Sequence, residues 1–507
     1  MPGVSQQSEF GCTSLLSAFA MTRITSMSFR LLLVSLLSAS NAFAATPYIT
    51  RAEPTECLVT GAGNVTVDDS ATILETFKRC STDSVIRFEQ KNYTVHTPIA
   101  LTGLKNVKVL FYGNWLLPQD VAKVQSAINA TQNPKSTYAT PWIYIDGTEV
   151  HIEGATEKEF GGFYGFGEQW WHTGNRILRP QLATFNVTNG SLKNLKVIKP
   201  IAWGWNLPGK NIHVENHFVD AKPDNATRED TKSFPFNTDG FNLSGKNITV
   251  DGYYGHNGDD CVSVISGAED IVAKNGFCGF SSHGLSIGSL GRDGAESTVK
   301  NVLFKNWTMD GAVYGARFKS WTGGRGYAHN VTWEDIELID VSTGIFVTQN
   351  YYDQDKGARP ENKNQTSTEL KTITFKNIHG SLGSNWTDGT CLSDPCWNYV
   401  EGLDEPKAVI LDLYPGTATD ISLQNIDIHP QDKPTGAANV LCDPAALSEG
   451  EDSVLGFKCQ NGAFQATDVT ARTSQADNNS GCRSGNHIPL FGGMAATLLG
   501  MLLVALL

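Results

Sequence analysis

Six ionisable residues in the middle of this chain have side chains suited to proton transfer and to holding an anion. They are Asp239, Asp259, Asp260, His283, Arg317 and Lys319. In such a set, one carboxyl group can donate a proton while other carboxylates activate water, and the cations can hold a negatively charged group. The residues therefore predict acid/base chemistry on an acidic substrate.

The adjacent pair Asp259-Asp260 is the centre of this set. On a strand, adjacent side chains point to opposite faces, whereas at a turn or bulge both can enter one cleft. Taken alone, such a pair is more often an Asx turn or a pair of calcium ligands. Asp239 lies 20 residues earlier, so three carboxylates can meet on successive turns of a repeat. Crowding raises the pKa of at least one carboxyl and favours its protonated form.

The remaining candidates follow at similar intervals. His283 lies among small residues that favour a tight turn. Arg317 and Lys319 are two positions apart, so their side chains leave the same face of a strand. We interpret them as residues that bind a substrate carboxylate, rather than as solvent-exposed basic side chains without a specific function. Tyr351 ends a further predicted strand, where it can pack in the core or stack on a sugar ring.

A degenerate repeat of two polar residues followed by an apolar-x-apolar pattern runs through most of the chain. Its copies begin at Lys193, Lys210, Lys246, Glu269, Lys300, His329, Lys371 and Thr419. Alternation with period two predicts short strands with one buried face. The copies lie 17 to 48 residues apart, too irregular for a propeller but typical of a solenoid with insertions. We predict an all-β fold, a single parallel β-helix over residues 45–465.

Two other segments of the solenoid have distinct patterns. Residues 69–80 predict a short helix that caps the N-terminal end of the strand stack. Residues 353–368 are polar and interrupted, which predicts an insertion loop.

Both ends of the chain carry targeting patterns. Residues 1–44 are expected to be a leader and signal peptide, with an apolar run from Leu31 to Leu37 and a cleavage pattern at Ala42-Phe43-Ala44. Residues 466–489 are a polar stalk, and the apolar tail at 490–507 is typical of a GPI-attachment signal. A transmembrane anchor is the alternative, although no basic residue follows the tail. We expect secretion, with possible GPI attachment at the cell surface or wall.

The cysteines support a secreted protein. Removal of the leader and tail removes Cys12 and Cys482, and eight of the ten cysteines remain. Proximity pairs them as Cys57/Cys80, Cys261/Cys278, Cys391/Cys396 and Cys442/Cys459, which predicts disulfides. No cysteine or histidine cluster has metal-ligand spacing, so we expect no metal site. Thirteen Asn-x-Ser/Thr sequons, from Asn64 to Asn478, suit the same secretory route.

Composition narrows the possible partners. The chain has 507 residues, of which 40% are hydrophobic and 18% charged, as in folded proteins. Its net charge of -13 argues against a nucleic-acid partner, which would require a basic surface. We expect a monomer.

Four ordered motifs carry a specific resemblance. They are Asn237-Thr238-Asp239, Gly258-Asp259-Asp260, the segment at His283, and Arg317-Phe318-Lys319, with an aromatic segment upstream at Gly165–Trp171. In this order, the motifs resemble those of glycoside hydrolase family 28, the polygalacturonases and their relatives. The resemblance covers roughly residues 50–430.

The resemblance implies a right-handed parallel β-helix that hydrolyses pectic polysaccharide with inversion, without a metal or other cofactor. Asp259 is then the general acid, Asp239 and Asp260 position and activate water, and His283 assists. The substrate-binding residues it implies are Asn237, Arg317, Lys319 and Tyr351.

Local departures from the family pattern bear on where the polymer is cut. Ser282 replaces a glycine and Phe318 replaces an isoleucine, while the segment at 315–324 looks more like fungal exo-acting members. Trp321 and the insertions at 223–234 and 353–368 can block one end of the cleft. We expect exo-acting cleavage of α-1,4-galacturonosyl linkages.

Other functions remain open at this point. Within the same chemistry they are an endo-polygalacturonase, an exo-rhamnogalacturonase and a xylogalacturonan hydrolase. From other classes they are a catalytically idle β-solenoid that binds wall polysaccharide, and a calcium-dependent pectate lyase.

Overall fold

The computed structural model describes residues 53–466, apart from 132–139, 225–232, 353–365, 384–388, 390–395, 397–398, 403–405, 449 and 451. The chain divides into two units, Met1–Glu53 and Pro54–Leu507, and the fold below is that of the described residues of the second. The predicted leader and apolar tail lie outside the described residues, as does nearly all of the stalk.

The described part of this unit consists mainly of strands, with a few short helices. The strands are β1 (Thr55–Val59), β2 (Thr82–Phe88), β3 (Asn92–Thr94), β4 (Ile99–Phe111), β5 (Asn114–Leu116), β6 (Pro141–Gly154), β7 (Gly162–Tyr164), β8 (Gln181–Lys193), β9 (Lys196–Ile198), β10 (Trp205–Leu207), β11 (Lys210–Asp220), β12 (Phe241–Leu243), β13 (Lys246–His256), β14 (Val262–Val264), β15 (Glu269–Gly279), β16 (Leu285–Leu290), β17 (Glu296–Asp310), β18 (Tyr314–Trp321), β19 (Arg325–Val341), β20 (Thr343–Tyr351), β21 (Glu369–Leu382), β22 (Lys407–Asp412), β23 (Ala418–Pro430), β24 (Asn439–Cys442) and β25 (Gly462–Ala463). The helices are α1 (Ser70–Arg79), α2 (Val121–Thr131), α3 (Glu168–Thr173) and α4 (Asp452–Leu455), with 3-10 turns η2 (Arg292–Gly294) and η4 (Pro444–Ala446).

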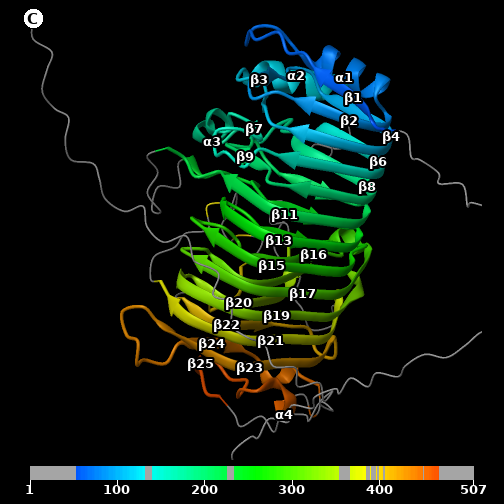
Figure 1. Cartoon of the computed structure of the whole chain (residues 1–507). Coiled ribbons are helices and arrows are strands. Elements are labelled where there is room, and N and C mark those ends of the chain that lie inside the picture. The colour runs from blue at the N-terminus through cyan, green and yellow to red at the C-terminus, as the bar shows by residue number, and fades with distance from the viewer. Residues whose placement is uncertain are drawn as a thin grey trace, which may run out of the picture. The chain divides into compact units, whose positions relative to one another are not determined.

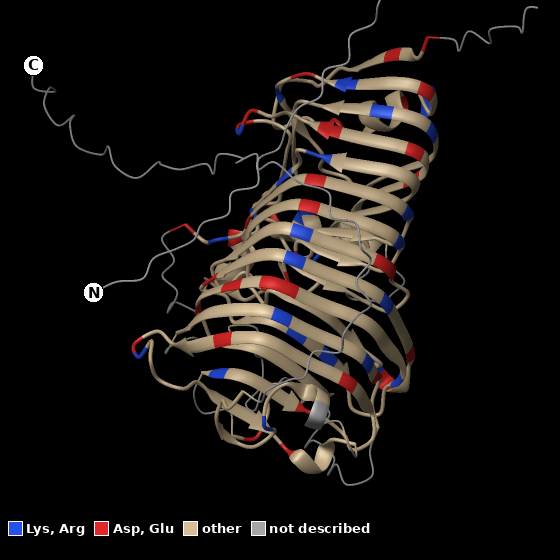
Figure 2. Cartoon of the chain, turned by 60° about the horizontal axis from the view of Figure 1, so that its bottom comes forward, with Lys and Arg blue, Asp and Glu red and all other residues tan. Residues whose placement is uncertain are grey.

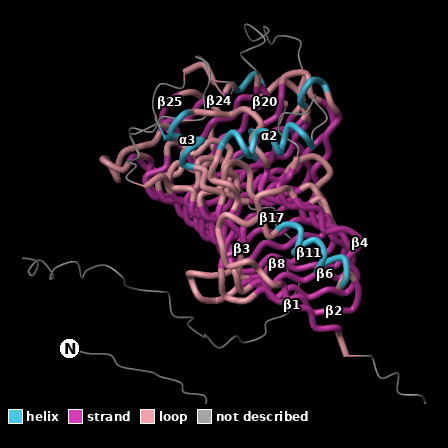
Figure 3. The backbone as a smooth tube through the Cα atoms, turned by 90° about the horizontal axis from the view of Figure 1, so that it is seen from above, coloured by secondary structure: helices cyan, strands magenta, loops and turns pink. Residues whose placement is uncertain are grey.

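The strands belong to successive turns of the β-helix, each stacked on the one before (Figure 1). Each such turn of the β-helix is called a coil below. Strands β11, β13, β15, β17, β19, β21 and β23 pair in parallel in that order, and β12, β14, β16, β18, β20 and β22 form a second parallel series. Figure 3 shows that strands make up most of the described backbone. The all-β parallel β-helix predicted from the repeat is confirmed.

The apolar positions of the repeat form two continuous inward ladders. The first contains Ile212, Ile248, Ile271, Val302, Val331, Ile373 and Ile421. The second contains Val214, Val250, Ala273, Phe304, Trp333, Phe375 and Leu423. In the second ladder, the ring of Trp333 stacks 5.4 Å from Phe304 and 4.8 Å from Phe375. Full burial of each large side chain contributes about 1.5–3 kcal/mol.

The polar residue just before each apolar pair forms a bend. Asn211 and Asn247 have φ angles of 54° and 53°, a left-handed conformation that asparagine adopts more readily than most residues. The Asn247 amide donates to Asn211 Oδ1 at 2.9 Å, so successive bends are linked. The copy at Lys193 differs, because the register places Asn189 beside Asn211, and Asn194 forms a second bend further along the coil.

Helix α1 matches the helix predicted at 69–80. Its Ile73 and Phe77 are buried, and the ring of Phe77 lies 6.3 Å from that of Phe88. Its role as a cap stays a prediction. The insertions expected at 223–234 and 353–368 fall mostly outside the described residues. No helix in the described part of the chain has the length and apolar character needed to cross a membrane.

Three of the four predicted disulfides are confirmed. They are Cys57–Cys80, Cys261–Cys278 and Cys442–Cys459. The Cys261–Cys278 bridge ties the residue after Asp260 to strand β15, whose end leads to His283.

The fourth predicted disulfide, between Cys391 and Cys396, is not confirmed as a pair. Cys396 is described, and it takes part in a disulfide bond as predicted. Its expected partner Cys391, however, lies outside the described residues. The participation of Cys396 in a disulfide therefore agrees with the sequence, whereas its pairing with Cys391 stays a prediction.

Charges of both signs are interspersed along the strands (Figure 2). Glu334, for example, pairs with Lys305 at 2.8 Å and with Lys376 at 2.6 Å across neighbouring coils. The lysines of these pairs are substantially exposed, so each pair contributes about 1 kcal/mol or less.

One histidine is buried within the aromatic core. His217 on β11 packs 4.6 Å from Phe241 and 6.5 Å from Trp205, measured between ring centroids. Among the described residues, neither of its ring nitrogens has a hydrogen-bond partner. Burial therefore lowers the pKa of His217 from 6.5 to about 3.

This histidine makes stability sensitive to acid. Below its ordinary pKa of 6.5 the unfolded chain binds a proton at His217, whereas the folded chain does not until the pH approaches about 3. Between pH 6.5 and about pH 3, the free energy of unfolding should therefore fall by about 1.4 kcal/mol for each unit by which the pH is lowered. The variant His217→Phe should lose that slope in denaturant unfolding measured at several pH values. The exposed control His379→Gln should keep it, and an unchanged slope in His217→Phe would contradict the assignment.

Candidate active site

Turns on successive coils bring the predicted acidic residues together. Asp239 lies between β11 and β12, Asp259 and Asp260 lie between β13 and β14, and His283 lies between β15 and β16. Because β12, β14 and β16 pair in register, these turns are neighbours in space. The next strand of the series, β18, carries Arg317.

Buried hydrogen bonds hold the turn of the Asp-Asp pair. The Asn257 amide donates to the backbone oxygens of Asp259 and Asp260 at 2.7 and 3.2 Å. The Gly258 N–H donates to Thr238 Oγ1 at 2.9 Å, which links this turn to that of Asp239. A side chain at Gly258 would come within 2.6 Å of the Pro235 oxygen, so glycine is required there.

Asp260 is held by two cations. Its Oδ1 lies 2.6 Å from Arg317 Nη2, and its Oδ2 lies 2.9 Å from Lys319 Nζ. Ser286 also donates to Oδ1 and accepts from Arg317 Nε at 3.0 Å. All four side chains are buried, so these charge-assisted bonds act in a weakly screening environment.

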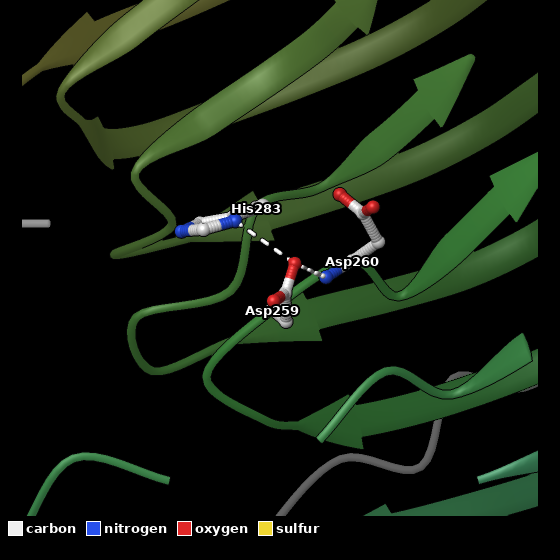
Figure 4. A group of neighbouring side chains, drawn as sticks. All are labelled: Asp259, Asp260 and His283. Carbon is white, nitrogen blue, oxygen red and sulfur yellow. Dashed lines mark hydrogen bonds and ion pairs between the residues drawn. The ribbon is translucent and has the colours of Figure 1, made fainter. Parts of the chain in front are cut away.

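Asp259 faces His283 (Figure 4). Its Oδ1 lies 3.0 Å from His283 Nδ1 and accepts from the Asp260 N–H at 2.9 Å. Its Oδ2 accepts from the Asn237 amide at 3.0 Å. Burial raises the pKa of Asp259, but His283, Lys319 and Arg317 outweigh burial and hold this pKa below its ordinary value.

Asp239 has the opposite electrostatic environment. Its Oδ1 is buried and has no hydrogen-bond partner among the described residues. Burial raises the pKa of Asp239 well above its ordinary value, and the negative charges of Asp259 and Asp260 raise it further. In the free site, Asp239 is therefore the carboxyl that favours the protonated state.

The structure places the expected substrate-binding residues around this cluster. Arg317 is 1% exposed and Lys319 7% exposed, and both pair with Asp260 rather than facing solvent. The buried carboxylates require these cations, so substrate binding cannot be the only function of Arg317 and Lys319. Tyr351 ends β20 next to β18, with its ring edge-on to Trp321 at 4.8 Å. The chemical roles of these residues stay predictions.

The donor set also bears on the calcium alternative. Asp259, Asp260 and His283 offer three ligand atoms within 4.8 Å of one another. Both oxygens of Asp260, however, already bind the cations Arg317 and Lys319. A divalent cation here would be repelled by those two charges, so the residues fit an ion-pair network better than a metal site.

Several supporting residues gave no motif signal. Arg179 donates to Asn237 Oδ1 at 2.7 Å, and Asn257 holds the Asp-Asp turn. Tyr314 packs edge-on to His283, with ring centroids 5.3 Å apart. Ser286 had a weak signal, since it lies in the same small-residue segment as His283.

Comparison with known proteins identifies the family. The model of the family described as "Glycosyl hydrolases family 28" matches residues 114–399. "Probable exopolygalacturonase C" of Aspergillus flavus is 35% identical over 418 residues, which cover 80% of this chain and 91% of that protein. "Exopolygalacturonase rpg16" of Rhizopus delemar is 28% identical and covers 62% of this chain and 76% of its own length. This protein belongs to glycosyl hydrolase family 28.

Solved structures agree on the fold. The endo-xylogalacturonan hydrolase from Aspergillus tubingensis superposes with a TM-score of 0.62, at 19% identity, over 81% of this chain and all of that one. A hyperthermoactive exopolygalacturonase from Thermotoga maritima gives a TM-score of 0.54 at 15% identity, over 76% of this chain and 88% of that one.

Proposed function

We propose that this protein is an exo-acting polygalacturonase that works as a monomer. It hydrolyses α-1,4-galacturonosyl linkages at the ends of pectic polysaccharide, with inversion. The observation that carries this proposal is the 35% identity to the Aspergillus flavus protein named an exopolygalacturonase, over 91% of that protein's length. The buried cluster of three carboxylates, one histidine and two cations supplies chemistry that fits.

Within this proposal, Asp259 donates the proton to the glycosidic oxygen, and Asp239 and Asp260 position and activate the attacking water. His283 assists, while Asn237, Arg317, Lys319 and Tyr351 support the galacturonate.

The pKa order in the free site adds a requirement to this mechanism. Burial raises the pKa of Asp259, but His283 and the cations lower this pKa by more. Burial and repulsion from the other two carboxylates raise the pKa of Asp239. A galacturonate carboxylate bound nearby brings negative charge, which opposes ionisation of Asp259 and favours its protonated form. The substrate thereby favours the protonated form of the proton donor, while Asp239 must be ionised before it can activate water.

The products from polygalacturonate test the proposed activity. We expect galacturonate monomer from the first time point in chromatography, with a slow loss of viscosity. Mixed oligomers with rapid loss of viscosity would instead indicate an endo-polygalacturonase. Unsaturated products that absorb in the ultraviolet would indicate a lyase. Activity confined to xylose-substituted or rhamnose-containing pectin would indicate a xylogalacturonan hydrolase or a rhamnogalacturonase, and inactivity on all pectins would indicate a binding protein.

A matched pair of variants tests the roles of the carboxyls. Asp259→Asn should reduce kcat on polygalacturonate by about 10²–10⁴-fold, since the amide is no general acid. The loss should be much smaller on a galacturonide with an acidic phenol as leaving group, which departs without a proton. Asp239→Asn should impair both substrates similarly, because both require attack by water. The exposed Asp427→Asn is the control, and the reverse pattern would assign proton donation to Asp239.

We infer that the protein is secreted and attached at the cell surface through a GPI anchor. The disulfides suit an oxidising compartment, and the sequences at 1–44 and 490–507 have the patterns of a signal peptide and an attachment signal. In the native host, phosphatidylinositol-specific phospholipase C should release the protein from the cell surface. Protein found inside the cell with the leader intact would refute secretion, and surface protein resistant to the phospholipase would refute the anchor.

A further inference from the structure

A buried arginine outside the four sequence motifs described above reaches the cluster. Arg179 lies just before β8 and is 1% exposed. Its Nη1 donates to the backbone oxygen of Phe236 at 2.9 Å, and its Nη2 donates to Asn237 Oδ1 at 2.7 Å. Its guanidinium also lies 5.3 Å from the ring centroid of Trp203. The planar fork thus holds two successive residues of the turn that leads to Asp239.

The bond from Arg179 sets the orientation of the Asn237 amide. With Oδ1 turned toward Arg179, the Nδ2 group is turned toward Asp259 and donates to its Oδ2 at 3.0 Å. A flipped amide would place an NH₂ group against the guanidinium and an oxygen against the carboxylate, so neither pair could hydrogen-bond. The backbone of Asn237 has a φ angle of 54°, the same left-handed conformation that Asn211 and Asn247 adopt at the bends of the coils.

We propose that Arg179 is a positioning residue for the proton donor, acting through Asn237 on Asp259. The inference rests on the proposed function for its catalytic meaning. When Asp259 gives up its proton, the hydrogen bond from Asn237 stabilises the carboxylate that remains. Arg179 thereby makes Asp259 a stronger acid during bond cleavage, although it does not itself touch the reacting atoms.

Kinetics of Arg179→Lys test this role. Lysine keeps the positive charge but lacks the planar fork, so it cannot hold Phe236 and Asn237 together in the same way. We expect kcat/KM to fall by about 10–100-fold, mainly through kcat, a range like that for residues that orient metal ligands. The alkaline limb of the pH profile should move to higher pH, because Asp259 becomes a weaker acid. An unshifted limb would overturn the proposal.

A double-mutant cycle separates positioning from general destabilisation. If Arg179 acts through Asn237, then adding Arg179→Lys to Asn237→Ala should reduce kcat/KM by less than about twofold further. Multiplicative losses would overturn the proposal. The control is Arg176→Lys, since the Arg176 guanidinium stacks 3.3 Å over the ring of Phe236 on the same turn. This control should leave the alkaline limb in place, and thermal unfolding of each variant checks its folding.

The crystal structure of Arg179→Lys gives a readout that does not depend on activity. We expect the Asn237 amide to turn away and its bond to Asp259 Oδ2 to be lost. An Asn237 amide that stays within hydrogen-bond distance of Asp259 would refute the proposal even in an active enzyme. If the unmodified protein fails to hydrolyse polygalacturonate, the proposed function fails, while this structure still decides whether Arg179 sets the geometry of Asn237.

Discussion

In-register parallel pairing of the coils is the constraint on which the rest of this molecule depends. Each coil must place its inward side chains over those of the previous coil, as Trp333 lies between Phe304 and Phe375. A slip of one residue would turn the buried face of a strand outward. The same register that forms the core therefore fixes the turns, and the turns place Asp239 and Asp259 on neighbouring coils.

Burying this cluster of charged side chains is costly, and the fold offsets part of that cost by pairing charges. Three carboxylates in one buried space repel one another, and two fixed cations offset only part of that repulsion. Arg317 and Lys319 both bind Asp260, whereas Oδ1 of Asp239 lacks any hydrogen-bond partner in the described structure. Burial and the negative charges of Asp259 and Asp260 raise the pKa of Asp239, whereas His283, Lys319 and Arg317 outweigh burial and lower the pKa of Asp259. In the free site, chemically equivalent carboxyls therefore favour different protonation states.

The sequence predicted the fold and the cluster from different kinds of pattern. The alternating repeat predicted strands and their inward faces correctly, because period two is a direct consequence of strand geometry. The repeat pattern aligned the copy at Lys193 with the copy at Lys210, although Asn189 and not Asn194 lies beside Asn211. The two positions are alike in sequence, because Asn194 and Asn211 both form left-handed bends with similar flanking residues. The motifs brought Asp259 and His283 into one site. They could not show that Arg317 is buried against Asp260, because pairing partners depend on side-chain directions that spacing does not specify.

The repeats are unevenly spaced in the sequence, yet their strands stack evenly in the structure. Both are possible because the additional residues lie in the turns between strands. Asn211 and Asn247 are 36 residues apart and Asn247 and Asp270 only 23, yet both steps join adjacent strands in register. The longer step includes the chain that leads through Phe236 to Asp239, and Arg179, which lies two coils earlier, binds that chain. A turn whose length can vary needs a fixed attachment before its last residues can take defined positions. The solenoid supplies that attachment from an earlier coil, which explains why an arginine outside the four sequence motifs can set the geometry of the site.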